Sequence, residues 1–174
     1  MNRPRSVRAL AVVAVLVVGL FGASGASATN IGDDEGCTPG FWKNNPGAWE
    51  EYNPDARLDS VFTIPAAFGE LADDTLLDAL SYKGGPESID KAKLLLHHAV
   101  AAILNAAHEG IGYPFRRDVP PLAIIPTVNS ALAGGDVDVM SDLKDVLDAA
   151  NNLGCPLAAD ESSNSSQASG HKLK

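Results

Sequence analysis

The chain has 174 residues, a formal net charge of −9 and a hydrophobic content of 45%. This acidic balance argues against a nucleic-acid partner, because binding to phosphate groups needs clustered lysine and arginine. The length suits one hydrophobic core rather than two, so we expect a single domain.

The first 28 residues have the pattern of a secretory signal peptide. Three arginines within the first eight residues precede an apolar stretch over 9–21, and Ala26-Ser27-Ala28 supplies a small-x-small cleavage site. The apolar stretch is shorter than the roughly 20 residues that a membrane-spanning helix needs. We therefore predict cleavage after Ala28, a secreted, extracellular location and no stable membrane insertion. A retained membrane anchor is the alternative.

Composition divides the rest of the chain into three parts. Residues 29–36 form a short acidic lead without apolar periodicity, and residues 158–174 form a Ser-rich tail with too little apolar surface to bury. We expect both to be disordered. The helical domain is predicted to span residues 37–157.

The only two cysteines, Cys37 and Cys155, lie near the two ends of that domain. Exported proteins meet oxidising conditions, in which such a pair remains bonded. We predict a Cys37–Cys155 disulfide, which would stabilise the fold by limiting the conformational entropy of the unfolded chain. Two free thiols are the alternative.

Apolar residues recur at helical spacing almost throughout the domain, and no alternating strand pattern of useful length occurs. The strongest helix is predicted over 86–109, where apolar residues recur every three or four positions and nothing interrupts the helix. Its many alanines should let neighbouring elements approach closely. The predicted fold is all-α, a single domain of about five helices around this long central helix, with its termini joined by the disulfide.

Four shorter helices are expected around the central one. Asn45 and Pro46 predict a cap and first turn for a helix through Tyr52, whereas Thr38-Pro39-Gly40 indicates a turn. Gly84-Gly85 would end a second helix. The ranges expected for these helices are 46–52, 73–82, 126–133 and, after Ser141 as N-cap, 142–153.

The stretch CTPGFWKNNPGAWEEY, residues 37–52, contains both tryptophans. Two interpretations of its aromatic residues are possible. In the first, the aromatic residues lie next to the disulfide and close the core as a structural corner. In the second, Trp42, Trp49 and Tyr52 are exposed and stack against sugars. We favour the structural corner, because the aromatic residues stand among turns, caps and a cystine.

Metal and catalytic sites find little support in the sequence. His97, His98 and His108 lack the four-residue spacing of a helical zinc pair, and the Asp136–Leu147 segment lacks the ligand pattern of a twelve-residue calcium loop. No nucleophile elbow or zinc-protease motif occurs, although facing carboxylates of a small extracellular hydrolase are not detectable in one sequence. We therefore expect no cofactor, no metal and no catalytic residue.

A resemblance follows from four segments of the chain. Residues 36–44 (GCTPGFWKN), 75–80 (TLLDAL), 99–107 (AVAAILNAA) and 150–156 (ANNLGCP) together resemble an exported microbial module with a CTPG-aromatic-WKN signature, a domain of unknown function. Asn45 stands where many of those proteins have histidine. The resemblance implies an exported location and the domain boundaries, and it transfers no catalytic residue. We expect an unknown extracellular or cell-surface partner. The sequence thus predicts a secreted, non-enzymatic structural or interaction module, with a carbohydrate-binding module and a small hydrolase as alternatives.

Overall fold

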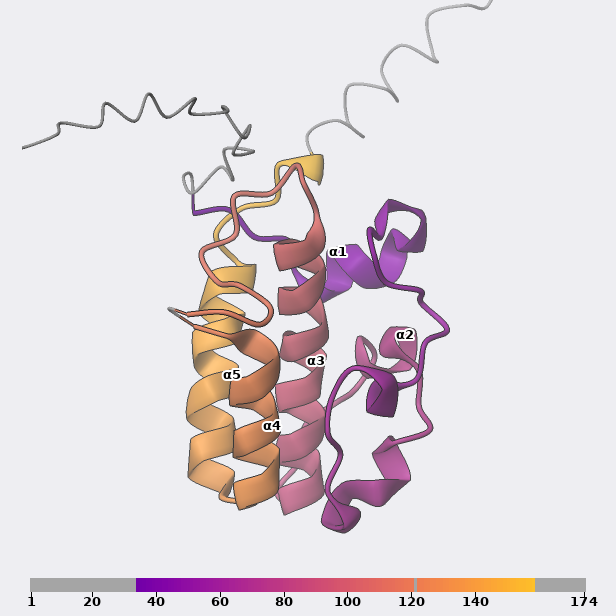
Figure 1. Cartoon of the computed structure of the whole chain (residues 1–174), viewed down its shortest axis with the longest axis vertical. Coiled ribbons are helices and arrows are strands. Elements are labelled where there is room, and N and C mark those ends of the chain that lie inside the picture. Colours follow the sequence, from indigo (N-terminus) through magenta and orange to yellow (C-terminus); the bar gives the residue numbers. More distant parts are fainter. Residues whose placement is uncertain (1–33, 121, 159–174) are drawn as a thin grey trace, which may run out of the picture.

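The computed structural model describes residues 34–120 and 122–158 (Figure 1). The predicted signal peptide, most of the acidic lead and nearly all of the Ser-rich tail lie outside these ranges. The described residues form helices, with isolated β-bridges but no β-strand among them.

The long helix α3 (Ser88–Ala107) runs the length of the domain and packs against α4 (Ile124–Gly134) and α5 (Val137–Asn151) (Figure 1). Eleven of its 20 residues are buried, five of them alanines. Small side chains let helix axes come close, so α5 lies along most of α3. The prediction of an all-α fold around one long central helix is confirmed.

The N-terminal part of the domain covers the other flank of α3 (Figure 1). It consists of α1 (Pro39–Asn44), η1 (Pro46–Ala48), η2 (Leu58–Ser60), η3 (Ala66–Leu71) and α2 (Leu76–Ala79), where η denotes a 3-10 helix. These short elements bring large apolar side chains into one core with α3. The fully or almost fully buried ones are Trp42, Leu58, Phe62, Phe68, Leu71 and Leu76.

The start of the domain is helical where a turn was predicted. Thr38 is the N-cap of α1, its hydroxyl accepting the backbone N–H of Phe41 at 3.1 Å, and Pro39 occupies the first helical position. The helix predicted over 46–52 is reduced to the single turn η1. It stops because Trp49 is extended and Glu51 has a positive φ of 61°, which an α-helix does not accommodate.

Two further helix boundaries differ from the prediction. The helix predicted over 73–82 is shortened to α2. It starts late because Thr75 is its N-cap and forms a capping box with Asp78, and it ends at Ala79, before its C-cap Leu80. The last helix begins at Val137 rather than after Ser141. Asp136 caps it by accepting the N–H groups of Asp138 and Val139, and Gly135, with a φ of 65°, ends α4 immediately before.

The folded domain also begins earlier than predicted. Glu35 was assigned to the acidic lead, yet its N–H donates to the carbonyl of Gly112 at 3.2 Å and its carboxylate accepts the Gly112 N–H at 2.9 Å. Gly36 is buried. The last two residues of that lead therefore belong to the domain.

None of the helices in the described ranges is both long enough and apolar enough to cross a membrane.

Candidate functional site

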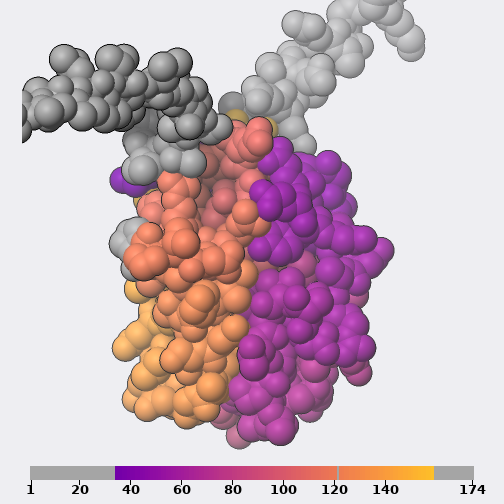
Figure 2. Space-filling view, in the orientation of Figure 1, coloured from indigo at the N-terminus to yellow at the C-terminus, as the bar shows by residue number. Residues whose placement is uncertain are grey.

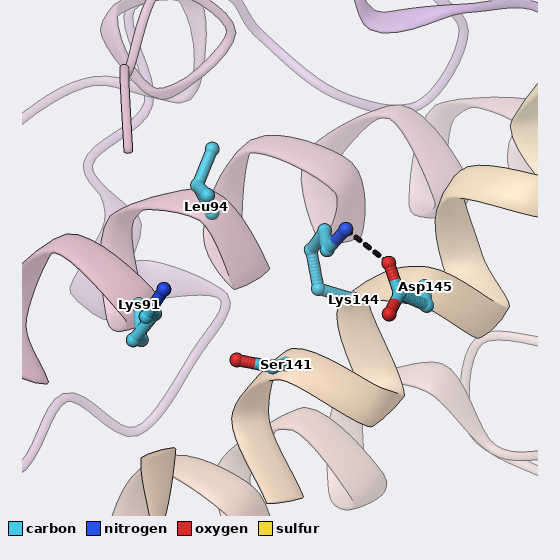
Figure 3. A pocket seen from close by; sticks show the side chains of 5 residues that line it. All are labelled: Lys91, Leu94, Ser141, Lys144 and Asp145. Atoms are coloured by element: carbon cyan, nitrogen blue, oxygen red, sulfur yellow. Dashed lines mark hydrogen bonds and ion pairs between the residues drawn. The ribbon is translucent and has the colours of Figure 1, made fainter. Parts of the chain in front are cut away.

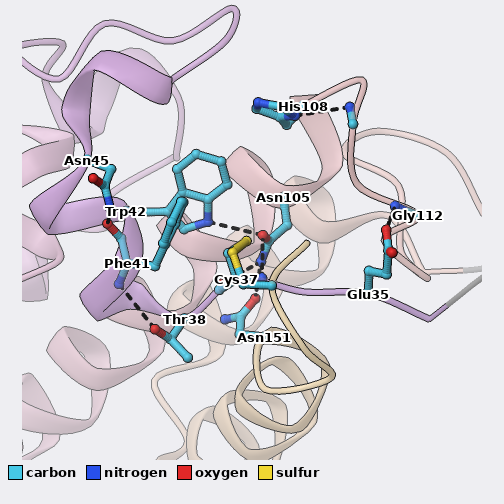
Figure 4. The surroundings of a disulfide bond; sticks show 12 residues. Glu35, Cys37, Thr38, Phe41, Trp42, Asn45, Asn105, His108, Gly112 and Asn151 are labelled. Carbon is cyan, nitrogen blue, oxygen red and sulfur yellow. Dashed lines mark hydrogen bonds between the residues drawn. A yellow bond between two sulfur atoms is a disulfide. The ribbon is translucent and has the colours of Figure 1, made fainter. Parts of the chain in front are cut away.

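Cys37 and Cys155 form the predicted disulfide, which joins the start of the domain to its end (Figure 4). Their Cα atoms lie 4.4 Å apart although the residues are separated by 118 positions. Next to the disulfide, the N–H of Gly36 donates to the carbonyl of Gly154 at 2.9 Å, as part of an antiparallel bridge. We call this region, comprising Gly36, Cys37, Trp42, Asn105, Tyr113, Asn151, Gly154 and Cys155, the disulfide corner.

Gly36 lies directly against the last turn of α5. A Cβ atom at this position would lie 2.1 Å from the carbonyl oxygen of Ala150. That separation is far below any van der Waals contact, and the obstacle is backbone rather than a flexible side chain. The glycine before Cys37 is therefore required by the close approach of two backbone segments.

Asn105 organises the polar interior of the disulfide corner (Figure 4). This α3 side chain is fully buried, and its oxygen accepts the N–H of Cys37 at 2.8 Å and the indole N–H of Trp42 at 3.1 Å. Its nitrogen donates to the carbonyl of Cys37 at 2.9 Å and to the side-chain oxygen of Asn151 at 2.9 Å. All four hydrogen bonds that a primary amide can make are formed.

Asn151, on α5, extends this network to the loop after α3. It is fully buried, and its side-chain oxygen also accepts the hydroxyl of Tyr113 at 2.8 Å, while its nitrogen donates to the carbonyl of His98 at 3.0 Å. Burial raises the pKa of the Tyr113 hydroxyl, which remains a neutral donor. One connected set of hydrogen bonds thus links α1, α3, α5 and the loop that holds Tyr113.

The three candidate aromatic residues do not form a common platform. Trp42 is fully buried and offers no face to a ligand, as expected for a structural corner. Trp49 is half-buried, and its indole N–H donates to the carbonyl of Trp42 at 3.0 Å. Tyr52 is half-buried beneath Arg117, whose guanidinium carbon lies 5.8 Å from the ring centroid. The sugar-stacking alternative therefore retains only Trp49 and Tyr52.

His108 ends α3 beside Trp42, but neither of its ring nitrogens is free to act as a base. Its Nδ1 accepts the N–H of Gly110 at 3.0 Å, and its Nε2 lies 3.5 Å from a carboxylate oxygen of Glu50. The other oxygen of Glu50 accepts the N–H of Glu109 at 2.8 Å. Both groups therefore fasten the loop after η1 to the end of α3.

His97 and His98 lie side by side on α3, with ring centroids 4.9 Å apart, and their chemistry is dominated by burial. Burial lowers the pKa of His97, and it lowers the pKa of His98 to about 4. The Nδ1 of His98 is buried without a hydrogen-bond partner and lies 3.6 Å from Asp148 on α5.

Neither suggested metal site is assembled in the described part of the chain. No three histidine, cysteine, aspartate or glutamate side chains in these ranges are grouped closely enough to hold an ion. Asp136, the first residue of the calcium loop considered above, is the N-cap of α5, and its side chain accepts backbone N–H groups of that helix.

A small hollow of about 190 Å³ lies between α3 and α5 (Figure 3). Lys91 and Leu94 line it from α3, and Ser141, Lys144 and Asp145 line it from α5. Its polar groups are largely engaged, because Lys144 pairs with Asp145 and the hydroxyl of Ser141 donates to the carbonyl of Val137. We assign it no ligand.

Sequence reasoning missed Asn105, Tyr113 and Asn151. For Asn105 a signal was available, because it is a lone asparagine within an apolar, alanine-rich helical stretch. A polar side chain at such a position is buried only when it is fully hydrogen-bonded. Its partners could not be named, because they lie up to 68 positions away.

Comparisons of the chain with protein families, with characterised proteins and with solved structures found no match.

Proposed function

We propose that this chain is an exported, non-enzymatic module that binds a partner at or near the cell surface. The observation that carries this proposal is the complete engagement of Asn105. The cysteine and the buried tryptophan of the CTPG-aromatic-WKN segment are both hydrogen-bonded to this one amide, so they serve the fold. These contacts support a structural role for the CTPG-aromatic-WKN segment rather than a catalytic one.

Two other observations support the proposal. The disulfide suits an oxidising compartment, in agreement with the signal-peptide pattern of residues 1–28. Within the described residues, His108 and Glu50 form an adjacent base and acid pair, yet both are used to fasten a loop. A general base needs a nitrogen that can reach the proton of a substrate.

The test is to collect the full chain from the culture medium, label it and add it to intact cells of its source. The proposal predicts saturable binding that protease treatment of the cells abolishes. Binding abolished by glycosidase treatment and competed by soluble polysaccharide would instead support the carbohydrate-binding alternative, with Trp49 and Tyr52 as its residues. Turnover of polysaccharide by the purified chain, with no saturable binding, would support the hydrolase.

A further inference from the structure

The exposed large apolar side chains of the domain gather along one helix. Five such residues are exposed in the described ranges, and four of them belong to α5 or to the turn after it. These four are Val137, Val139, Val146 and Leu153, with exposed fractions of 39%, 50%, 45% and 47%. Scattered exposed apolar residues are ordinary, whereas exposed apolar residues that adjoin one another on one face indicate a contact surface.

Two of these valines lie on the same side of α5. Val139 and Val146 are seven residues apart, which places them two turns apart and within about 20° of each other around the axis. The neighbouring α4 carries no charged residue over its eleven positions, and its exposed residues Pro126, Ser130, Ala133 and Gly134 are small. α4 and α5 lie side by side on one face of the domain (Figure 2).

Acidic side chains border this apolar stripe. Asp138, Asp142 and Asp145 of α5 are exposed, and the one basic residue of the helix, Lys144, pairs with Asp145. A partner that covers Val139 and Val146 therefore also comes close to Asp138 and Asp142. Opposite charge on the partner would favour the encounter, whereas like charge would oppose it.

We propose that the exposed face of α5, namely Val139 and Val146 with Asp138 and Asp142, docks a basic amphipathic helix of another polypeptide. An apolar stripe on that helix would cover the valines, and its flanking lysine or arginine residues would meet the aspartates. This inference rests on the proposed function and specifies the partner.

Two other occupants fit the same face less well. A second copy of this chain, pairing antiparallel through α5, would bring the same acidic flank against itself. A membrane surface rich in anionic lipid would repel it. The chain's own Lys172 and Lys174 are basic but flank a single apolar residue, Leu173, which is too little to cover two valines.

The test measures binding of a labelled synthetic 18-residue helix, with leucines spaced three and four apart and lysines elsewhere, to the full chain by fluorescence anisotropy. Two variants alter the face: Val139→Ser with Val146→Ser, and Asp138→Asn with Asp142→Asn. Two matched controls make similar changes elsewhere at exposed positions: Val119→Ser, and Asp55→Asn with Glu109→Gln. All these positions are exposed, so the variants should fold, which circular dichroism would check.

Each face variant is expected to weaken binding at least tenfold, and each control by less than twofold. The same peptide with glutamate in place of lysine should not bind. Equal weakening by the face and control variants would show attraction to bulk charge alone and overturn the inference, as would no binding of the lysine peptide at all.

Three further outcomes would also overturn it. Tighter peptide binding after Lys172→Gln with Lys174→Gln would assign the face to the chain's own tail. A concentration-dependent dimer lost on Val139→Ser would assign it to a second copy. Cell binding of the labelled chain that is unchanged by the valine variant would place the contact elsewhere, yet leave the proposed function standing. Absence of any cell binding would instead remove the proposed function itself.

Discussion

Asn105 and Cys37 lie 68 positions apart and exchange two hydrogen bonds between the side-chain amide of one and the backbone of the other. The arrangement resembles one rung of a β-ladder, with the amide of Asn105 taking the place of a partner strand. These hydrogen bonds fix the cysteine against α3, while the disulfide fixes the same residue to Cys155 at the end of the domain. Covalent and polar constraints therefore meet at one residue.

Replacing Asn105 with alanine should destabilise the domain strongly. The change leaves the N–H and carbonyl of Cys37, the indole N–H of Trp42 and the side-chain oxygen of Asn151 without one of their partners. Each buried unsatisfied group costs about 1 to 3 kcal/mol, so we expect a loss of at least about 3 kcal/mol in the free energy of unfolding. Urea denaturation measures it. Asn152→Ala, at an exposed asparagine whose side chain bonds only within α5, is the control and should cost under about 1 kcal/mol.

Gly36→Ala should be nearly as damaging, because its Cβ would lie 2.1 Å from the carbonyl oxygen of Ala150. Separating the two backbone segments would strain the adjacent disulfide corner, and we expect a loss of about 3 kcal/mol, at the upper end of overpacking effects. Gly47→Ala is the matched control, since nothing lies within 4 Å of the added Cβ. Equal melting temperatures for the two variants would contradict the close packing at Gly36.

Acid should destabilise the domain through His98. Its pKa is about 4 in the folded protein against 6.5 for an unperturbed histidine, mainly because burial disfavours the charged form. The unfolded chain therefore binds a proton more readily, so the stabilisation is complete above pH 6.5 and is lost as the pH falls towards 4. The loss from this residue is at most about 3 kcal/mol. His97, whose pKa is also lowered, adds a change of the same sign.

The variant His98→Leu isolates that effect. It removes the titrating ring and the buried nitrogen without a partner, so unfolding free energy at pH 7 should be equal to or higher than that of the parent. Between pH 6.5 and 4 the variant should lose less stability than the parent. Denaturation curves across this range decide the matter, and parallel pH profiles of parent and variant would show that His98 is not responsible.

The two tryptophans should differ in their access to solvent. Trp42 is fully buried, whereas Trp49 is half-buried. In the variant Trp49→Phe the remaining indole is that of Trp42, so emission should shift to shorter wavelength and iodide should hardly quench it. The parent should show partial quenching from Trp49. Strong quenching of the folded Trp49→Phe variant would mean that Trp42 is exposed, and would restore the three-residue platform.

Much of this fold could be predicted because its strongest signals are local. The uninterrupted apolar periodicity of 86–109 predicted α3 nearly to its ends, and two cysteines allow only one intramolecular disulfide. Errors arose where two local signals competed. Asp136 and Ser141 are both good N-caps, and Asp136 caps α5 because Gly135, in a left-handed conformation, ends α4 just before it. Thr38-Pro39 fits either a turn or a helix start, and the hydroxyl contact with the N–H of Phe41 makes it the latter.

The interior of the disulfide corner depends on contacts between distant residues, and this is why it could not be predicted. Asn105 has no recognisable spacing to Cys37 or Trp42, and Tyr113 reaches Asn151 only after the chain reverses beyond α3. Similarly, the exposure of Val139 and Val146 could not be predicted from the sequence, because an apolar residue on an amphipathic helix is ordinarily expected to face the core. Tertiary packing decides both cases.

Peptide mapping of the protein recovered outside the cell, by mass spectrometry without reduction, tests most directly whether this is an exported domain held by a covalent link between its ends. An exported domain of this kind should have its N-terminus at Thr29 and yield a pair of peptides joined through Cys37 and Cys155. Recovery of the chain with both sulfurs free, or of a chain that still carries residues 1–28, would contradict it.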